Sequence, residues 1–190
     1  KDGQAVAVLI TSDRAIFENS RFLGFQDTIY LKGQQDDPSK TKDVRHYFKN
    51  CYIEGTTDFI FGAATAVFQN CEIYAKESAT YLTAASTPEG KKFGFVFIDC
   101  KITGEAKSQS VYLGRPWRPF AKTVFINTEI SNVIKPEGWH NWNKPDAEKT
   151  TFYGEYNSKG IGANSEKRVS WSHQLSKKEA KEYCDNIIAN

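Results

Sequence analysis

Two aspartates occupy the same place in two similar stretches of the sequence. Asp27 is the eighth residue after Asn19, Asp58 is the eighth residue after Asn50, and each stretch has a glycine at its fifth place. If these stretches are neighbouring strands of a parallel sheet, the two side chains lie about 4.8 Å apart. Carboxylates that close repel each other, which raises one pKa and lowers the other. Such a pair could supply an ionised nucleophile and a protonated acid, although paired aspartates can also bind Ca²⁺ or be solvated at a turn.

Other residues offer chemistry that suits such a pair. Gln4 and Gln26 carry neutral amide donors for a developing oxyanion. Arg115, in a Gly-Arg-Pro-Trp stretch, has a planar guanidinium that can hold a carboxylate in a fixed geometry. Flat surfaces for sugar rings could come from four aromatic residues, namely Tyr30, Phe61, Trp117 and Trp139. Each feature taken alone also fits an ordinary turn or core residue.

A repeated pattern indicates the fold that would bring these residues together. In five segments a Phe is followed two places later by Asn or Asp, and three places further by another apolar residue. The repeated Phe residues are separated by 31, 20, 29 and 28 residues, and they are Phe17, Phe48, Phe68, Phe97 and Phe125. Short strands at such intervals predict a right-handed parallel β-helix with the Phe side chains stacked inside, one per coil. The alternative is an antiparallel β-sandwich in which these matches are coincidental.

The register of the repeat makes further predictions. The Asn and Asp positions are expected at a bend, where a side chain can bond its own backbone. The same count of eight from Asn70 reaches Ser78, so the column of carboxylates is expected to be two coils tall. Cys51, Cys71 and Cys100 each follow the repeated Asn or Asp and should stack on successive coils. They could form one disulfide, Cys51–Cys71 or Cys71–Cys100, or stay as buried thiols.

Composition excludes several classes of protein. Hydrophobic residues make up 39% and aromatic residues 14% of the 190 residues, which is enough for a folded domain over residues 1–190. A net charge of +2 gives no strong nucleic-acid footprint and would tolerate an acidic polymer. There is no apolar run of membrane-spanning length. With three His and no CxxC spacing, the sequence does not predict a metal site or a cofactor.

The C-terminal segment has a different pattern from the repeats. Ser176 and Glu179 form a capping-box pattern. Apolar residues then follow at helical spacing, namely Ala180, Tyr183, Cys184 and Ile187. This predicts a short amphipathic helix that packs near the end of the solenoid and covers an exposed edge.

Several ordered blocks resemble the pectin methylesterases of plants and bacteria. The resemblance covers nearly the whole chain and rests on Gly3-Gln4-Ala5-Val6-Ala7, Gly24-Phe25-Gln26-Asp27-Thr28, Asp58-Phe59-Ile60-Phe61-Gly62, Leu113-Gly114-Arg115-Pro116-Trp117 and Thr151-Phe152-Tyr153-Gly154-Glu155-Tyr156. The longer coil before Asn50, which includes residues 34–43, is more similar to bacterial members. Members normally have further coils before the first of these blocks, so the chain is expected to be the C-terminal portion of such a catalytic domain. An open solenoid end predicts aggregation or dimerisation.

The resemblance implies a role for each candidate residue. Asp58 matches the nucleophile and Asp27 the general acid/base. Gln4 and Gln26 match the residues that stabilise the tetrahedral intermediate, and Arg115 the residue that positions the nucleophile. The aromatic positions that line the substrate cleft are matched by Tyr30, Phe61, Trp117 and Trp139.

The activity implied is hydrolysis of methyl esters in methyl-esterified homogalacturonan (pectin), through an acyl-enzyme and without a metal or cofactor. Such a substrate implies a secreted or periplasmic protein, with no nucleic-acid or membrane partner. Two rival functions stay open. One is a pectate lyase or polygalacturonase on the same solenoid, which would break the polymer chain. The other is a pectin-binding fragment without activity.

Overall fold

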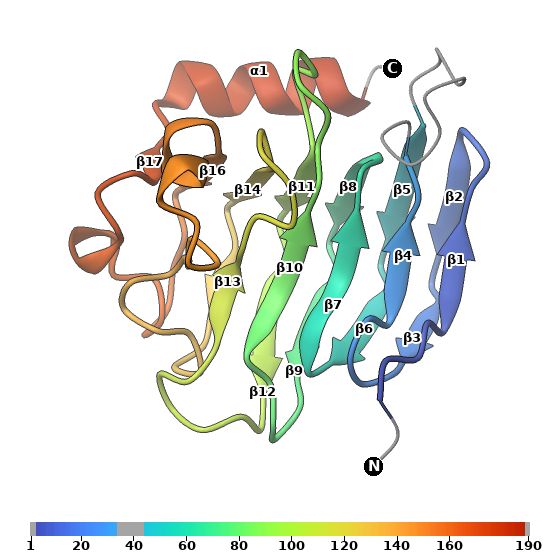
Figure 1. Ribbon diagram of the computed structural model, residues 1–190, viewed down its shortest axis with the longest axis horizontal. Helices are drawn as coiled ribbons and strands as arrows, with labels where there is room; N and C mark the ends of the chain where they lie inside the picture. Colours follow the sequence, from blue (N-terminus) through green and yellow to red (C-terminus); the bar gives the residue numbers. More distant parts are fainter. Residues whose placement is uncertain (1–2, 34–43, 189–190) are drawn as a thin grey trace.

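The chain winds into a right-handed parallel β-helix with three sheets along its length (Figure 1). This computed structural model describes residues 3–33 and 44–188. One sheet, called the site sheet because Asp27 and Asp58 lie on it or directly before one of its strands, contains β1 (Val8–Ile10), β4 (Ile29–Leu31), β7 (Thr57–Gly62), β10 (Tyr81–Ala85) and β13 (Tyr112–Gly114). The seven-stranded sheet contains β2 (Ala15–Glu18), β5 (Arg45–Lys49), β8 (Thr65–Gln69), β11 (Phe95–Ile98), β14 (Lys122–Ile126), β16 (Phe152–Tyr156) and β17 (His173–Gln174). The third sheet contains β3 (Arg21–Leu23), β6 (Tyr52–Gly55), β9 (Glu72–Ala75), β12 (Lys101–Gly104) and β15 (Glu129–Ile130).

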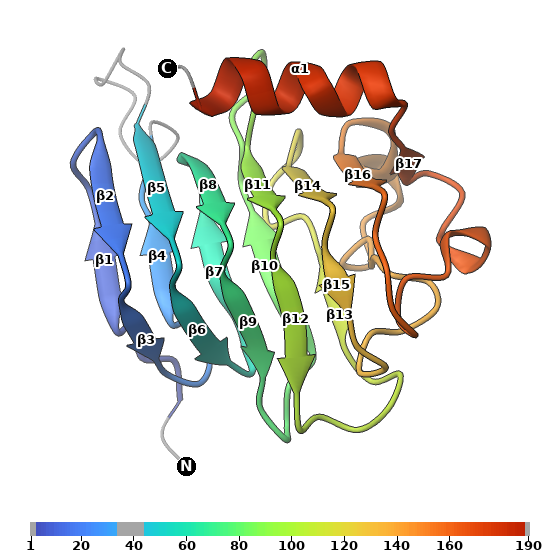
Figure 2. The ribbon, with the colours of Figure 1, turned by 180° about the vertical axis from the view of Figure 1, so that it is seen from behind.

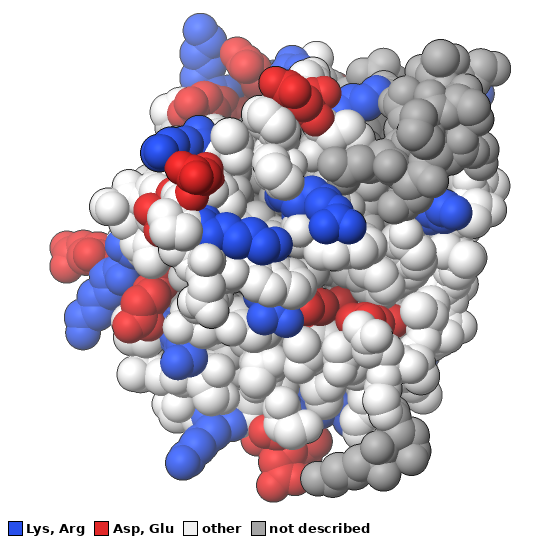
Figure 3. Space-filling model, in the orientation of Figure 1, with Lys and Arg blue, Asp and Glu red and all other residues white. Residues whose placement is uncertain are grey.

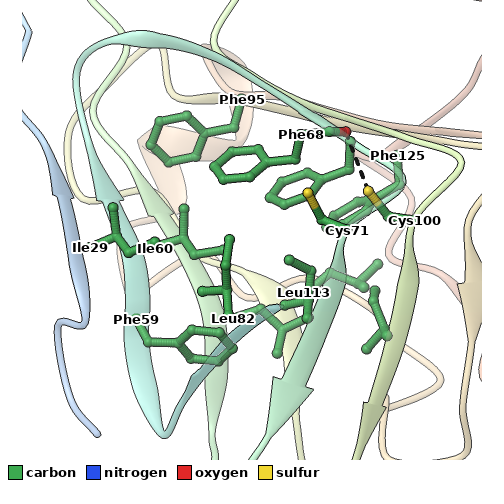
Figure 4. Packing of buried hydrophobic residues seen from close by; sticks show 14 of the residues in the cluster. Ile29, Phe59, Ile60, Phe68, Cys71, Leu82, Phe95, Cys100, Leu113 and Phe125 are labelled. Carbon is green, nitrogen blue, oxygen red and sulfur yellow. Dashed lines mark hydrogen bonds between the residues drawn. The ribbon is translucent and has the colours of Figure 1, made fainter. Parts of the chain in front are cut away.

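The repeated Phe residues form a continuous stack inside the helix, as predicted. They occupy one register position on β2, β5, β8, β11 and β14. Ring centroids of successive coils are 5.1, 4.7, 4.5 and 4.4 Å apart from Phe17 to Phe125. Figure 4 shows part of this interior, with Phe68 and Phe125 beside Cys71 and Cys100. Each fully buried Phe contributes about 2–3 kcal/mol through burial, so this stack is a main source of stability.

The Asn and Asp positions lie at the predicted bend, but their side chains bond one another rather than their own backbone. Asn19, Asn50, Asn70, Asp99, Asn127 and Asn157 all have φ between 51° and 53°. This left-handed conformation suits Asn and Asp better than other residues with a side chain. The amide of Asn70 donates to Asn50 Oδ1 at 2.7 Å, and the amide of Asn127 donates to Asp99 Oδ1 at 3.1 Å. Asp99 has no amide hydrogen to donate to Asn70, which interrupts the column.

The three cysteines that follow this bend stack on successive coils, as their register predicted. Cys51, Cys71 and Cys100 are buried and are free thiols, so of the two alternatives the structure has the unbridged one. The Cys51 N–H donates to Cys71 Sγ at 3.4 Å. The Cys100 thiol donates to the Phe68 carbonyl at 3.3 Å (Figure 4). The thiols therefore act as small polar groups that are satisfied inside the core.

The C-terminal helix α1 (Lys177–Ile188) has the predicted cap but a different packing site. The Ser176 N–H donates to Glu179 Oε2 at 2.7 Å, and the Glu179 N–H donates to Ser176 Oγ at 3.3 Å. The helix does not cover a solenoid edge. It crosses the outer face of the seven-stranded sheet (Figure 2), where it packs against Val67, Val96, Ile98, Val124 and Ile126. These residues make that outer face apolar and explain why the helix lies there.

After β15 the chain leaves the regular coils and is held by a buried ion pair. This region contains two 3₁₀ helices, Pro145–Lys149 and Ser165–Lys167. The Arg168 Nε donates to Glu155 Oε1 at 2.7 Å, and both side chains are almost completely buried. Arg168 also donates to the carbonyls of Lys135, Pro136 and Gly162. The pair therefore anchors the loop that follows residue 135. Within residues 3–33 and 44–188, no helix has the length and apolar character that crossing a membrane requires.

The strands of the first described coil form an edge with exposed apolar side chains. Leu9 on β1 is 52% exposed, Ile16 on β2 is 65% exposed and Leu23 on β3 is 54% exposed. The predicted association through this end of the solenoid stays a prediction. The similarity of the long coil to bacterial members also stays one, because residues 34–43 lie outside the described residues.

We expect the substitution Asp99→Asn to stabilise the protein, because an amide there could donate to Asn70 Oδ1 and join the two halves of the column. The gain should be about 0.5–1.5 kcal/mol, the usual net value of one hydrogen bond. Urea unfolding of Asp99→Asn measures it. Asp146→Asn is the matched control, because Asp146 is 94% exposed and lies outside the column. A control variant that gained as much stability would contradict the expectation.

Candidate active site

Asp27 and Asp58 lie side by side at the start of neighbouring strands in the site sheet. Ile29 pairs with Ile60, so the residues two places earlier share one register position. Both aspartates are in the left-handed region, with φ of 63° and 50°. The Asp27 N–H donates to the Thr57 carbonyl at 3.0 Å, which ties one coil to the next at this bend.

A glycine precedes each aspartate by three residues and makes the bend possible. A Cβ at Gly24 would lie 2.5 Å from Thr28 Oγ1, and a Cβ at Gly55 would lie 2.3 Å from Phe59 Cβ. Any side chain would therefore collide with the strand that follows. Steric exclusion of a side chain thus explains why both stretches have glycine at the fifth place. The bend that these glycines allow turns both aspartates toward the same face.

Asp58 is held by Arg115 in a two-pronged ion pair. Arg115 Nε donates to Asp58 Oδ1 at 2.9 Å, and its terminal nitrogen donates to Oδ2 at 2.7 Å. The Asp58 side chain is 9% exposed. Burial raises the pKa of Asp58, while the hydrogen bonds and charge of Arg115 act in the opposite direction. The ion pair favours the ionised form, but burial has the larger effect, so the pKa of Asp58 stays above its ordinary value.

Asp27 has a different environment and a higher pKa. The Gln4 amide donates to Asp27 Oδ2 at 2.8 Å. Burial, together with the negative charge of Asp58, raises the pKa of Asp27 from 3.8 to about 6. The hydrogen bond from Gln4 and the charge of Arg115 lower it by less. The pKa of both neighbouring carboxyls is therefore raised, so the expectation that one of the two pKa values would be lowered is wrong.

Backbone contacts to two neighbouring segments fix the position of Arg115. The Arg115 N–H donates to the Thr83 carbonyl at 3.0 Å, and the Leu113 N–H donates to the Gly138 carbonyl at 2.7 Å. A Cβ at Gly114 would lie 2.2 Å from Thr83 Oγ1, so only glycine fits between these segments. The Gly-Arg-Pro-Trp stretch is therefore a strand end pressed against its neighbours.

Three of the four predicted aromatic residues gather on the surface beside the pair. Tyr30 and Phe61 stack with ring centroids 4.5 Å apart, and Trp117 meets both rings edge-on. Each of them is half-buried. Gln26, which precedes Asp27 directly, is also half-buried. These rings form an apolar wall next to the carboxyls.

Trp139 does not belong to this wall, and its prediction as a surface residue is wrong. It is 1% exposed and stacks on Tyr153 at 4.3 Å, below Gly114 in the core. It extends the interior aromatic stack beyond Phe125, 5.9 Å away. A Trp in this place supports the end of β13, directly before Arg115, and cannot contact a polymer.

Sequence reasoning missed two residues next to Arg115. The guanidinium carbon lies 3.8 Å from the ring centroid of Tyr81 and 3.6 Å from that of Trp142. Ser78, the expected next member of the column, instead lies exposed in a turn before β10. Tyr81 pairs with Thr57 and Thr83 with Ile60, so β7 has one more residue than β10 between these pairs and bulges at Asp58. Only the alignment of β10 with β7 could have identified Tyr81.

Charge is distributed unevenly over this face. Figure 3 shows acidic side chains together near its centre, with Lys and Arg gathered toward the later coils. The surface over β1 and β4 is largely uncharged (Figure 3). Among the described residues, no group of three or more His, Cys, Asp and Glu side chains is arranged to hold a metal ion.

Comparison with known proteins identifies the family. The Pectinesterase family model matches residues 1–189. The chain belongs to the pectinesterase family. Pectinesterase 31 of Arabidopsis thaliana is 44% identical over 180 residues, which cover 94% of this chain and 53% of that relative. The chain thus spans about half the length of the curated pectinesterase.

Solved pectin methylesterases have the same fold. The structure of pectin methylesterase from carrot superimposes with a TM-score of 0.83 at 33% identity, over 97% of this chain and 60% of that chain. A pectin methylesterase solved in complex with a hexasaccharide superimposes with a TM-score of 0.70 at 30% identity, over 90% of this chain and 55% of that chain. The β-helix described above is therefore the pectinesterase fold.

The raised pKa of Asp27 predicts that this carboxyl reduces the stability of the protein at neutral pH. Near pH 3 the carboxyl is protonated in both folded and unfolded chains, whereas above about 6 the folded protein must ionise it against its surroundings. The contribution of Asp27 to the free energy of unfolding therefore falls as pH rises between those values. Asp27→Asn should be more stable than the parent by about 1–3 kcal/mol at pH 8, with the difference shrinking at pH 3.

Urea unfolding of both proteins at the two pH values measures this difference. Asp146→Asn is again the control, because Asp146 is 94% exposed. A gain for Asp27→Asn that did not depend on pH would argue against a raised pKa.

Proposed function

We propose that this chain hydrolyses the methyl esters of galacturonate units in pectin and releases methanol. The observation that supports this most directly is the pair of neighbouring carboxyls with unlike partners. Asp58 is bound by Arg115, and Asp27 has a pKa of about 6. One acid and one carboxylate in contact with the same ester are the groups that two-step ester hydrolysis requires. We also infer that residues 1–190 form a single parallel β-helix domain that is the C-terminal portion of a catalytic domain, since the described strands build one solenoid.

In the first step, an ionised Asp58 oxygen attacks the ester carbonyl carbon. The new C–O bond gives a tetrahedral intermediate, and the bond to the methoxy oxygen then breaks. Asp27 gives its proton to that oxygen, so methanol leaves and an acyl-enzyme anhydride remains on Asp58. Arg115 presents the carboxylate in one orientation through its two hydrogen bonds.

In the second step, the ionised Asp27 takes a proton from water as the water oxygen attacks the acyl carbon. The bond to Asp58 breaks, which returns Asp58 as a carboxylate and Asp27 as an acid. A galacturonate carboxyl is the second product. Each residue therefore ends the cycle in the state in which it began, and no cofactor enters the proton balance.

Amide groups and aromatic rings suit the remaining needs of this reaction. Gln4 uses one of its amide hydrogens on Asp27, which leaves the other for an oxyanion. Gln26 is the second amide that we assign to this role. Tyr30, Phe61 and Trp117 offer flat apolar surface for methyl-esterified sugar rings. A polymer substrate of this kind implies action outside the cytoplasm, in a secreted or periplasmic setting.

The test is methanol release from highly methylated pectin. We expect Asp58→Ala to reduce turnover by about 10³-fold or more, because the nucleophile is lost. We expect Arg115→Ala to lower kcat more than it weakens pectin binding. Asp146→Ala is the control. Normal turnover by Asp58→Ala would remove the proposed nucleophile. Shortened or unsaturated oligosaccharides would indicate a glycosidase or lyase, and binding without methanol release would indicate a binding module.

The pKa of Asp27 also sets an expected pH dependence. Acylation needs protonated Asp27, so its rate should fall about tenfold per pH unit once the pH exceeds about 6. The measurement is the methanol burst in rapid-mixing experiments from pH 4 to 9. A burst rate that rises steadily to pH 9 would show that Asp27 does not act as the acid.

A further inference from the structure

The guanidinium of Arg115 lies against two aromatic rings from different segments. Tyr81 comes from β10, and Trp142 comes from the loop after Trp139. Their ring centroids are 3.8 and 3.6 Å from the guanidinium carbon, and the Arg115 side chain is 17% exposed. Cation–π contacts of this kind contribute about 0.5–2 kcal/mol each. They also restrict rotation of the guanidinium plane, on which the two-pronged contact to Asp58 depends.

Trp142 contacts Arg115 from a turn whose backbone is held in an unfavourable conformation. Trp142 and Asn143 have φ of 58° and 55°, in a region that bulky residues rarely adopt. The Trp142 N–H donates to His140 Nδ1 at 3.0 Å. The Asn143 N–H donates to Asn141 Oδ1 at 2.9 Å. These two hydrogen bonds hold the turn from which the indole contacts Arg115.

His140 accepts the Trp142 hydrogen bond only while its Nδ1 is unprotonated. Its ring lies 5.7 Å from that of Tyr81 and 5.1 Å from that of Tyr112. Burial, with the positive charges of Arg115 and Lys135, lowers the pKa of His140. The groups facing it are therefore two neutral rings, two cations and one N–H donor. Of these, the two cations and the N–H donor favour the neutral imidazole that the loop requires.

We propose that Tyr81, Trp142 and His140 are positioning residues for the nucleophile, acting through Arg115. Tyr81 and Trp142 fix the guanidinium plane, and His140 fixes the backbone of Trp142. This inference rests on the proposed function, in which Asp58 attacks the ester. Without the clamp, Arg115 would contact Asp58 in several orientations, and its effect on the carboxylate would weaken.

Trp142→Leu tests the clamp, with Trp142→Phe as the conservative variant. We expect kcat to fall about 10–100-fold in Trp142→Leu, with KM within about twofold of the parent. The acidic side of the profile of kcat against pH should shift to higher pH, because Asp58 becomes harder to ionise. Trp142→Phe should restore most of kcat. Tyr74→Leu is the matched control, since Tyr74 is a half-buried tyrosine on β9 that contacts Tyr52 in the third sheet.

Two variants of His140 separate its hydrogen bond from its bulk. Asn at this position offers an oxygen near the place of Nδ1, and leucine offers none. His140→Asn should keep most of the activity, whereas His140→Leu should behave like Trp142→Leu. Equal activity of the two variants would overturn the role of His140.

Carbon-13 NMR of the aspartate carboxyls makes the test independent of activity. The Asp58 signal, identified with Asp58→Asn, is titrated without substrate in the parent, Trp142→Leu and Tyr74→Leu proteins. We expect the pKa of Asp58 to rise by about 0.5–1 unit in Trp142→Leu alone. An unchanged pKa overturns the clamp. Absence of methanol release by the parent would instead overturn the proposed function, and the titration would still decide whether the clamp exists.

Discussion

Parallel pairing between successive coils is the constraint on which the rest of this structure depends. Each coil hydrogen-bonds to the next with its strands in register, so a residue's place within its coil determines its neighbours. The same spacing that stacks Phe48 on Phe68 in the core brings Asp27 beside Asp58 at the surface. In the core the contact is favourable, and at the surface it forces two like charges together. The reactive arrangement is therefore a by-product of the geometry that stabilises the fold.

The last part of the chain connects this regular core to the site. The buried Arg168–Glu155 pair binds the carbonyls of Lys135 and Pro136, at the start of the loop that carries Trp139 and Trp142. Burying two charges is costly, and breaking such a pair by removing one partner costs about 3–5 kcal/mol. Here the hydrogen bonds that Arg168 donates to Glu155 and to the backbone carbonyls offset the free energy of burying the two charges. The loop that follows residue 135 thus places the Trp139 indole against Gly114 and the Trp142 indole against the guanidinium of Arg115.

The sequence predicted what repeats and failed where the repeat ends. Phe17 to Phe125 and the two aspartates were found because each keeps a fixed offset from the Asn or Asp of its coil. Ser78 was misplaced because Thr83, the register partner of Ile60, lies thirteen residues after Asn70, whereas Ile60 lies ten residues after Asn50. Trp139 and Trp142 lie beyond the last repeat, so nothing in their spacing tells a core indole from a surface one. The amphipathic pattern of α1 identified its apolar side but not the surface that it meets.

The column formed by Cys51, Cys71 and Cys100 allows the separation of neighbouring coils to be measured by chemical labelling of the thiols. Each sulfur is shielded as long as neighbouring coils stay together, since the three residues are at most 2% exposed. An alkylating reagent can reach them only during local unfolding, so the rate of labelling reports how often a given coil separates. The three positions sample three successive turns of the solenoid.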